Sequence, residues 1–157
     1  MTKILLSLHV LAAIVAIGPV TVAASMFPPA ARRAAAALGE TAGPSAVGTV
    51  ALLHRICRVY SGIGLTVPVL GLATGAAMGV LGSGWLVTSI ALTAAAAGIL
   101  AAFVLPRQEE LLDRLNGEQA VEHGNTVQLA MFTGVFNLLW ATVTVLMIVR
   151  PGSTTGA

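Results

Sequence analysis

Two polar residues, His9 and Asn137, lie inside long apolar stretches of this sequence. An imidazole or an amide facing lipid without a partner is costly, so we expect both side chains to face other helices. Counting along the helices places Thr88 and Thr144 at the height of His9, and their hydroxyls are its expected partners. Polar groups inside a membrane are also functional candidates. For both residues we favour hydrogen bonding between helices over a ligand role.

A second set of candidate residues lies between the apolar stretches and contains the other two histidines. It comprises His54, Arg55, Arg58, Glu109, Asp113, Glu122 and His123. Counting from a short turn at 82–84 brings the basic members to the height of the acidic ones, which predicts a collar of ion pairs at one membrane surface. A ligand or proton site is the alternative interpretation. His54 and His123 could share a site, but two histidines without a third ligand do not predict a metal.

Other catalytic patterns are missing from the sequence. There is no HExxH motif and no carboxylate inside an apolar stretch, and the glycine-rich segments lie within those stretches, so they are not phosphate loops. The single cysteine, Cys57, excludes an internal disulfide and a Cys-Cys metal pair, and we expect it to be a small buried residue. We therefore predict no catalytic residue, no metal and no bound cofactor.

The composition indicates a membrane protein. Hydrophobic residues make up 57% of the 157 residues and charged residues only 9%, against about 25% charged residues in a soluble domain. Although the net charge is +2, the basic residues form no run, which argues against nucleic acid as a partner. Four segments are long enough to cross a bilayer in a single domain, at 4–27, 59–81, 85–105 and 127–149. The first also resembles a signal peptide, but its apolar run is longer than a typical signal core, so we predict a retained helix.

The predicted fold is an all-α bundle of four transmembrane helices. Four crossings place both termini on one face, and most arginines lie in the two long connections at 28–58 and 106–126. The positive-inside rule then puts these connections in the cytoplasm and both termini outside, in a bacterial inner membrane. Helices two, three and four are expected to continue past the bilayer on the cytoplasmic side. We also expect a short surface helix over 29–38 and a flexible tail over 151–157.

Small residues recur at helical spacing on the second and third spans. The predicted packing positions are Gly64, Pro68, Gly71, Gly75 and Gly79 on the second span and Gly98 on the third. Such faces allow close backbone contact between helices in lipid. We expect them to pack within the bundle, with homodimerisation as the alternative.

The opening helix, with LHVLAAIVAIGP around His9, resembles small bacterial four-helix membrane proteins related to the copper-resistance D family. It is more faintly similar to the haem-binding membrane protoporphyrinogen oxidases, in which a first-helix histidine is a haem ligand. The second resemblance implies that His9 could hold haem b.

Three functions remain as hypotheses. The first is a non-enzymatic membrane component that acts as a scaffold, an accessory subunit or a partner-binding protein, with another membrane protein or a second copy as its partner. The second is a haem-binding or redox protein that uses His9. The third is a channel or transporter for a small solute.

Overall fold

The computed structural model describes residues 2–38 and 43–152, and all regular secondary structure in these two ranges is helical. The elements are α1 (Thr2–Ala36), α2 (Gly43–Gly64), α3 (Thr66–Met78), α4 (Gly84–Ile99), the π-helix η1 (Leu100–Val104), α5 (Leu105–Asn116) and α6 (His123–Val149). They form four rods, namely α1, α2 with α3, α4 through α5, and α6. All four are long and apolar enough to cross a membrane, which confirms the predicted number of candidate spans.

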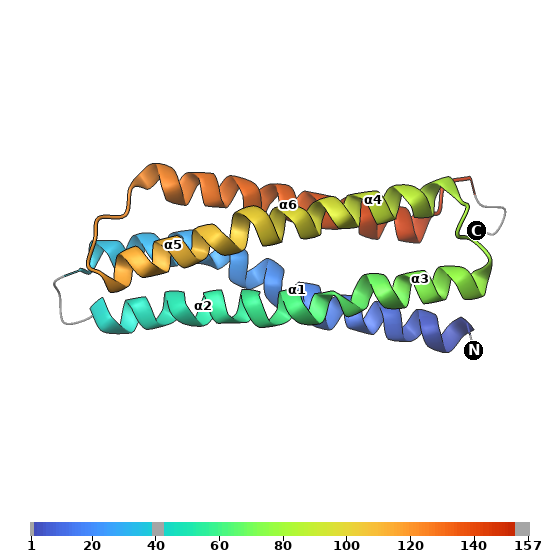
Figure 1. The fold of residues 1–157 in the computed structure, drawn as a ribbon, viewed down its shortest axis with the longest axis horizontal. Coiled ribbons are helices and arrows are strands. Elements are labelled where there is room, and N and C mark those ends of the chain that lie inside the picture. Colours follow the sequence, from blue (N-terminus) through green and yellow to red (C-terminus); the bar gives the residue numbers. More distant parts are fainter. Residues whose placement is uncertain (1, 39–42, 153–157) are drawn as a thin grey trace.

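The four rods lie alongside one another, and successive rods run antiparallel (Figure 1). The start of α1 and the end of α6 lie at the end of the bundle that holds the turn from α3 to α4, while the end of α1, the start of α2 and the connection from α5 to α6 lie at the other end. We call residues 2–19, 65–95 and 137–152 the terminal half. Residues 20–38, 43–64 and 96–136 form the core half.

The second rod is interrupted at a single residue, Leu65, between α2 and α3. The cause is Pro68, which has no N–H to donate to the carbonyl of Gly64 and whose ring crowds that carbonyl. The rod otherwise runs from Ser45 to Met78, so the second span does continue as a helix well before residue 59. It ends at Gly79, whose φ of 69° lies in the left-handed region that glycine adopts without strain.

The third rod contains a π-helical segment, η1, which ends two residues before Pro106. A proline at this position removes the hydrogen bond to the carbonyl of Ala102, and a wider π turn is a common way to accommodate such a defect. The rod then continues as α5, which turns Gln108, Leu111 and Leu115 into the bundle. The third span therefore continues as a helix through Pro106 to Asn116.

The short surface helix predicted for 29–38 is not a separate element. Instead, α1 continues through Pro28 and Pro29 to Ala36. Phe27, Ala31 and Ala34 are fully buried along this part of α1, so packing on the core stabilises a helix that two prolines would otherwise end. Of the predicted flexible tail, residues 153–157 lie outside the described part of the chain.

The hydrophobic core lies almost wholly in the core half. Its largest fully buried apolar side chains are those of Phe27, Phe136, Leu111, Leu115 and Leu129. They come from α1, α5 and α6, and they pack with Val50, Leu53 and Cys57 of α2. Four helices therefore converge on one packed centre at this end of the bundle.

Candidate ligand cavity and the buried polar residues

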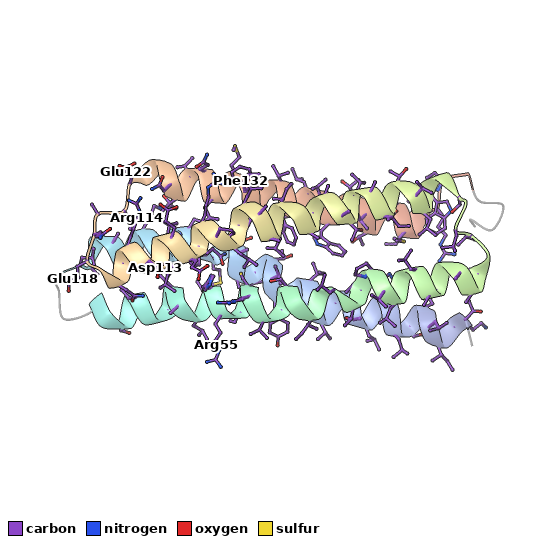
Figure 2. All side chains as sticks on the ribbon, viewed as in Figure 1. Arg55, Asp113, Arg114, Glu118, Glu122 and Phe132 are labelled. Carbon is purple, nitrogen blue, oxygen red and sulfur yellow. The ribbon has the colours of Figure 1, made fainter. Side chains whose placement is uncertain are left out.

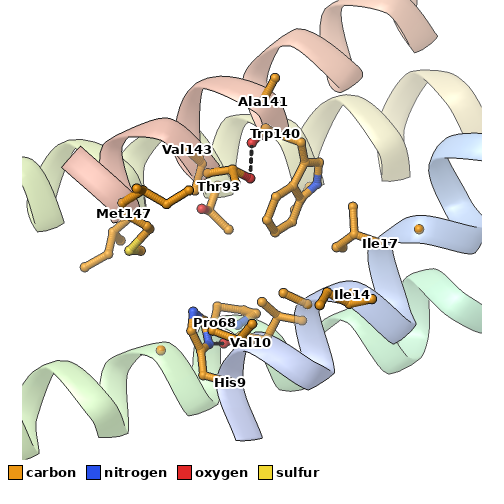
Figure 3. Close-up of a pocket in the computed structure, with 18 of the residues that line it drawn as sticks. His9, Val10, Ile14, Ile17, Pro68, Thr93, Trp140, Ala141, Val143 and Met147 are labelled. Carbon is orange, nitrogen blue, oxygen red and sulfur yellow. Dashed lines mark hydrogen bonds between the residues drawn. The ribbon is translucent and has the colours of Figure 1, made fainter. Parts of the chain in front are cut away.

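A cavity of about 1210 Å³ separates the two pairs of rods in the terminal half. One wall comes from α1 and α3 and the other from α4 and α6, as Figure 3 shows. Most of the lining is apolar. Six large apolar lining residues are also between 40% and 75% exposed, namely Val10, Ile14, Val22, Leu72, Ile90 and Ile148. The cavity is therefore bordered by side chains that also form the outer surface of the bundle.

His9 lies on the α1 wall of this cavity, and its contacts hold it against α3. Its Nδ1 is 3.0 Å from the carbonyl oxygen of Val67. A carbonyl only accepts, so Nδ1 must carry the proton, and in a neutral imidazole Nε2 is then an unprotonated acceptor. Gly71 allows this close packing, because a Cβ there would lie 2.9 Å from Cε1 of His9. His9 faces another helix, as the sequence indicates, but its bonding partner is a backbone carbonyl.

The two threonines predicted as partners of His9 do not bond to it. Thr88 donates to the carbonyl of Gly84 at 2.8 Å, and Thr144 donates to that of Trp140 at 2.9 Å. A threonine on a helix can always reach the carbonyl four residues before it, and that local bond competes with longer-range ones. His9 therefore does bond to another helix, as predicted, but the prediction that Thr88 and Thr144 are its partners is wrong. Thr144 still lines the cavity.

Asn137 lies where α6 passes the deep end of the cavity. Its Nδ2 donates to the hydroxyl of Ser25 on α1 at 3.1 Å, which is the interhelical bond expected for this amide. Its Oδ1 is buried and has no partner among the described residues. A buried acceptor without a donor is unusual in a folded protein, so this atom marks a position where a ligand donor could bind.

Arg150 lies at the other end of the lining, directly after α6. Its Nε donates to the carbonyl of Met147 at 3.2 Å, and its guanidinium lies over the Trp85 ring, 5.6 Å from the ring centre. These contacts fix the side chain at the edge of the cavity. Sequence reasoning missed this role, although a basic residue after an apolar span near a tryptophan is a typical interfacial pattern.

The charged set predicted to form an ion-pair collar is not brought together. Arg55, Arg58, Glu109, Asp113, Glu122 and His123 are all exposed. Figure 2 shows Arg55 pointing away from the bundle. Within the described ranges the one ion pair is Arg114–Glu110 at 2.9 Å, which lies within α5. The reason is the orientation of α5, which turns its apolar face and Gln108 inward and its carboxylates outward.

His54 is the exception in that set, because it is buried in the core half. Its Nδ1 lies 3.3 Å from Oε1 of Gln108, whose Nε2 donates to Sγ of Cys57 at 3.6 Å. The predicted height of this part of α2 against α5 was thus correct to within about one helical turn. Sequence reasoning missed Gln108, the buried polar residue that links the two helices.

Cys57 is fully buried, as expected. The described residues hold no group of three metal-ligating side chains.

A second feature missed from the sequence joins η1 and α5 to α6 at the same end of the bundle. Phe103 and Phe132 stack with ring centres 4.8 Å apart, and the guanidinium of Arg107 lies 4.6 Å from the centre of the Phe132 ring. This arrangement keeps the arginine charge close to an apolar surface through a cation–π contact.

The predicted packing glycines divide into two groups. Besides Gly71, Gly75 is tightly packed, since a Cβ there would lie 2.9 Å from Leu86 of α4, while at Gly64 the nearest atom is 3.7 Å away in Ile17 of α1. At Gly79 and Gly98 an added Cβ would meet nothing within 4 Å, so these two do not serve close packing. Pro68 lines the cavity. The second span thus packs mainly on α1, and it approaches α4 only near their connecting turn.

No family model, no curated protein and no solved structure matches this chain. The resemblance of the first helix to copper-resistance D relatives stays a prediction. The cavity and its lining residues are therefore the features that bear on function.

Proposed function

We propose that this protein is a non-enzymatic partner-binding component of the membrane, and that its binding site is the cavity of the terminal half. The observation that supports this most directly is the 1210 Å³ apolar space between the two pairs of rods. Ligand sites are typically apolar hollows with a few placed polar groups, which describes this cavity with His9 and Asn137. Its exposed apolar borders suit a molecule that enters sideways from the hydrocarbon of the bilayer.

The same proposal includes a place and an orientation in the cell. We propose a bacterial cytoplasmic membrane with the core half and its arginines toward the cytoplasm and both termini outside. The helices of the core half then extend beyond the hydrocarbon, because rods of 33 to 35 residues are about 50 Å long against a hydrocarbon core of about 30 Å. A reporter that works only outside the cytoplasm should be active when it is fused to the carboxyl terminus. If a reporter that works only in the cytoplasm is active there instead, the orientation is the opposite of the one proposed.

The binding proposal is tested by filling the cavity. Ala94 lines it on α4, whereas the adjacent Ala95 does not, and both are exposed small residues. The wild-type protein and an Ala95→Phe control, released gently from membranes into native mass spectrometry, should each carry a bound lipophilic molecule. Ala94→Phe should lose it. If all three proteins are free of any bound molecule, or all three keep it equally, the cavity is not a binding site.

A second candidate function is haem binding, and the orientation of His9 favours it. With Nδ1 bonded to the Val67 carbonyl, Nε2 is the unprotonated nitrogen, and histidines that bind metals commonly donate their other N–H to a carbonyl in this way. The cavity beside the ring is large and apolar, so the residues present fit a haem. His9 and Met147, which lies on the opposite wall (Figure 3), are the residues that would hold the haem. Bound haem would supply one-electron redox chemistry.

An absorption spectrum decides between the two candidates. Protein expressed with haem supplied should show a Soret band that His9→Ala removes and Thr88→Ala retains. A spectrum without this band rejects the haem function and leaves the first proposal intact. The third hypothesis, a channel or transporter, gains no support from the cavity, because nearly all of its lining lies in the terminal half.

A further inference from the structure

One cation, Arg150, lies at the edge of an otherwise uncharged cavity. Among the described residues that line the cavity, Arg150 is the one Lys, Arg, Asp or Glu. Its guanidinium is held by the Met147 carbonyl and the Trp85 ring, and no carboxylate of the described residues lies within 4.0 Å of it. A guanidinium with fixed orientation is suited to bind a phosphate or a carboxylate through paired N–H donors.

The length of the cavity along the bundle indicates what kind of molecule could bind there with its polar group at Arg150. Arg150 and Asn137 are both lining residues of one rod and stand 13 positions apart, which corresponds to about 20 Å along a helix. Half of a bilayer's hydrocarbon core is about 15 Å. The cavity thus covers the depth of one leaflet, with its charge at the chain-terminal end of the bundle and apolar walls beyond.

From this geometry we propose that the ligand is an anionic membrane lipid. Its phosphate binds the guanidinium of Arg150, and one acyl chain occupies the space between the α1–α3 wall and the α4–α6 wall. The exposed side chains of Ile14 and Ile148 border the cavity where the second chain can remain in the bilayer. This inference rests on the proposed binding function and specifies the ligand of the same cavity.

The Trp85 ring holds the guanidinium of Arg150 at the edge of the cavity. The Trp85 side chain is only 7% exposed, and its Nε1 has no partner among the described residues. A tryptophan at the membrane interface usually bonds through this N–H. Trp85 does not line the cavity, so what it contributes to the site is the ring face that orients the guanidinium of Arg150.

The test uses the full chain and two lipids of matched acyl chains, phosphatidylglycerol and phosphatidylethanolamine, offered in equal amounts. Native mass spectrometry should show one bound lipid per chain, with the anionic lipid preferred by at least about tenfold, because both headgroups carry a phosphate but the ammonium of phosphatidylethanolamine offsets its attraction to the guanidinium. Arg150→Gln should keep a bound lipid and lose the preference. The matched control Arg58→Gln, which removes an exposed arginine of the core half, should keep both.

The outcomes separate the two proposals. If lipid binds without a preference for the anionic headgroup, or if Arg150→Gln and Arg58→Gln reduce the preference equally, the lipid assignment is wrong. In that case the binding function stands, provided that Ala94→Phe abolishes lipid binding. A dimer without bound lipid would assign the cavity to a second copy of the chain and overturn the lipid assignment. Circular dichroism of each variant verifies that it is folded.

Discussion

The two halves of this bundle are built from the same four rods but differ in how the space between the rods is filled. In the core half, Phe27, Leu111 and Phe136 meet at the centre and are at most 2% exposed. In the terminal half the corresponding space is a cavity between the α1–α3 pair and the α4–α6 pair. Lipid chains are as apolar as leucine, so apolar side chains alone do not hold helices together inside a bilayer. Separation of the rods there costs little if a ligand or lipid fills the space.

The largest expected difference between the halves comes from matched truncations of leucine. Leu111→Ala should destabilise the protein by about 2–5 kcal/mol, because Leu111 is 2% exposed in the packed centre. Leu72→Ala should cost only about 1 kcal/mol, because this cavity-lining residue is already 46% exposed. Unfolding in mixed micelles by added dodecyl sulfate measures both. Equal losses would mean that the terminal half is packed as tightly as the core half.

The buried polar link of the core half gives the next effect. Gln108→Leu removes the partner of a buried His54 and should cost about 1–3 kcal/mol, since a buried polar group is left unsatisfied. In the same unfolding assay, the double variant His54→Leu/Gln108→Leu should recover part of this loss. Strictly additive losses from the single variants would show that the two side chains do not interact.

A contact in the terminal half tests the position of His9. Gly71→Ala adds a Cβ 2.9 Å from the imidazole, so we expect a loss near the lower end of the roughly 1–3 kcal/mol typical of overpacking. The control Gly62→Ala, with nothing within 4 Å, should be neutral or stabilising by up to about 1 kcal/mol. Combining Gly71→Ala with His9→Ala should relieve the clash. Thermal unfolding in detergent measures the stability of each variant. If Gly71→Ala and Gly62→Ala change stability equally, the imidazole of His9 does not lie against Gly71.

The smallest effect is expected at the surface of the core half. Glu110→Gln breaks the Arg114–Glu110 pair, which lies at the exposed surface of α5, and should cost no more than about 0.5 kcal/mol. Glu109→Gln and Asp113→Asn should change stability even less. If Glu109→Gln or Asp113→Asn instead causes a larger loss of stability that depends on salt, the ion-pair collar predicted from the sequence does form. Unfolding at low and high salt distinguishes the two arrangements.

Several features followed from the sequence because each depends on local composition or on a single residue. The four rods follow from runs of apolar residues, the interruption at Leu65 follows from Pro68, and the turn predicted at 82–84 lies within the connection between α3 and α4, which begins slightly earlier, at Gly79. An inward position for His9 and Asn137 also followed, since lipid offers no partner to a polar group.

The tertiary structure decided which groups meet, because helix rotation and separation depend on all the packing contacts at once. The π-helix before Pro106 and the packing of Leu111 and Leu115 turn Gln108 inward and the carboxylates of α5 outward, so His54 binds an amide and the predicted collar does not form. Sequence spacing alone could not reveal the cavity, since it arises from the separation of two helix pairs. Its position places Arg150 beside the cavity, where the charge can select a ligand.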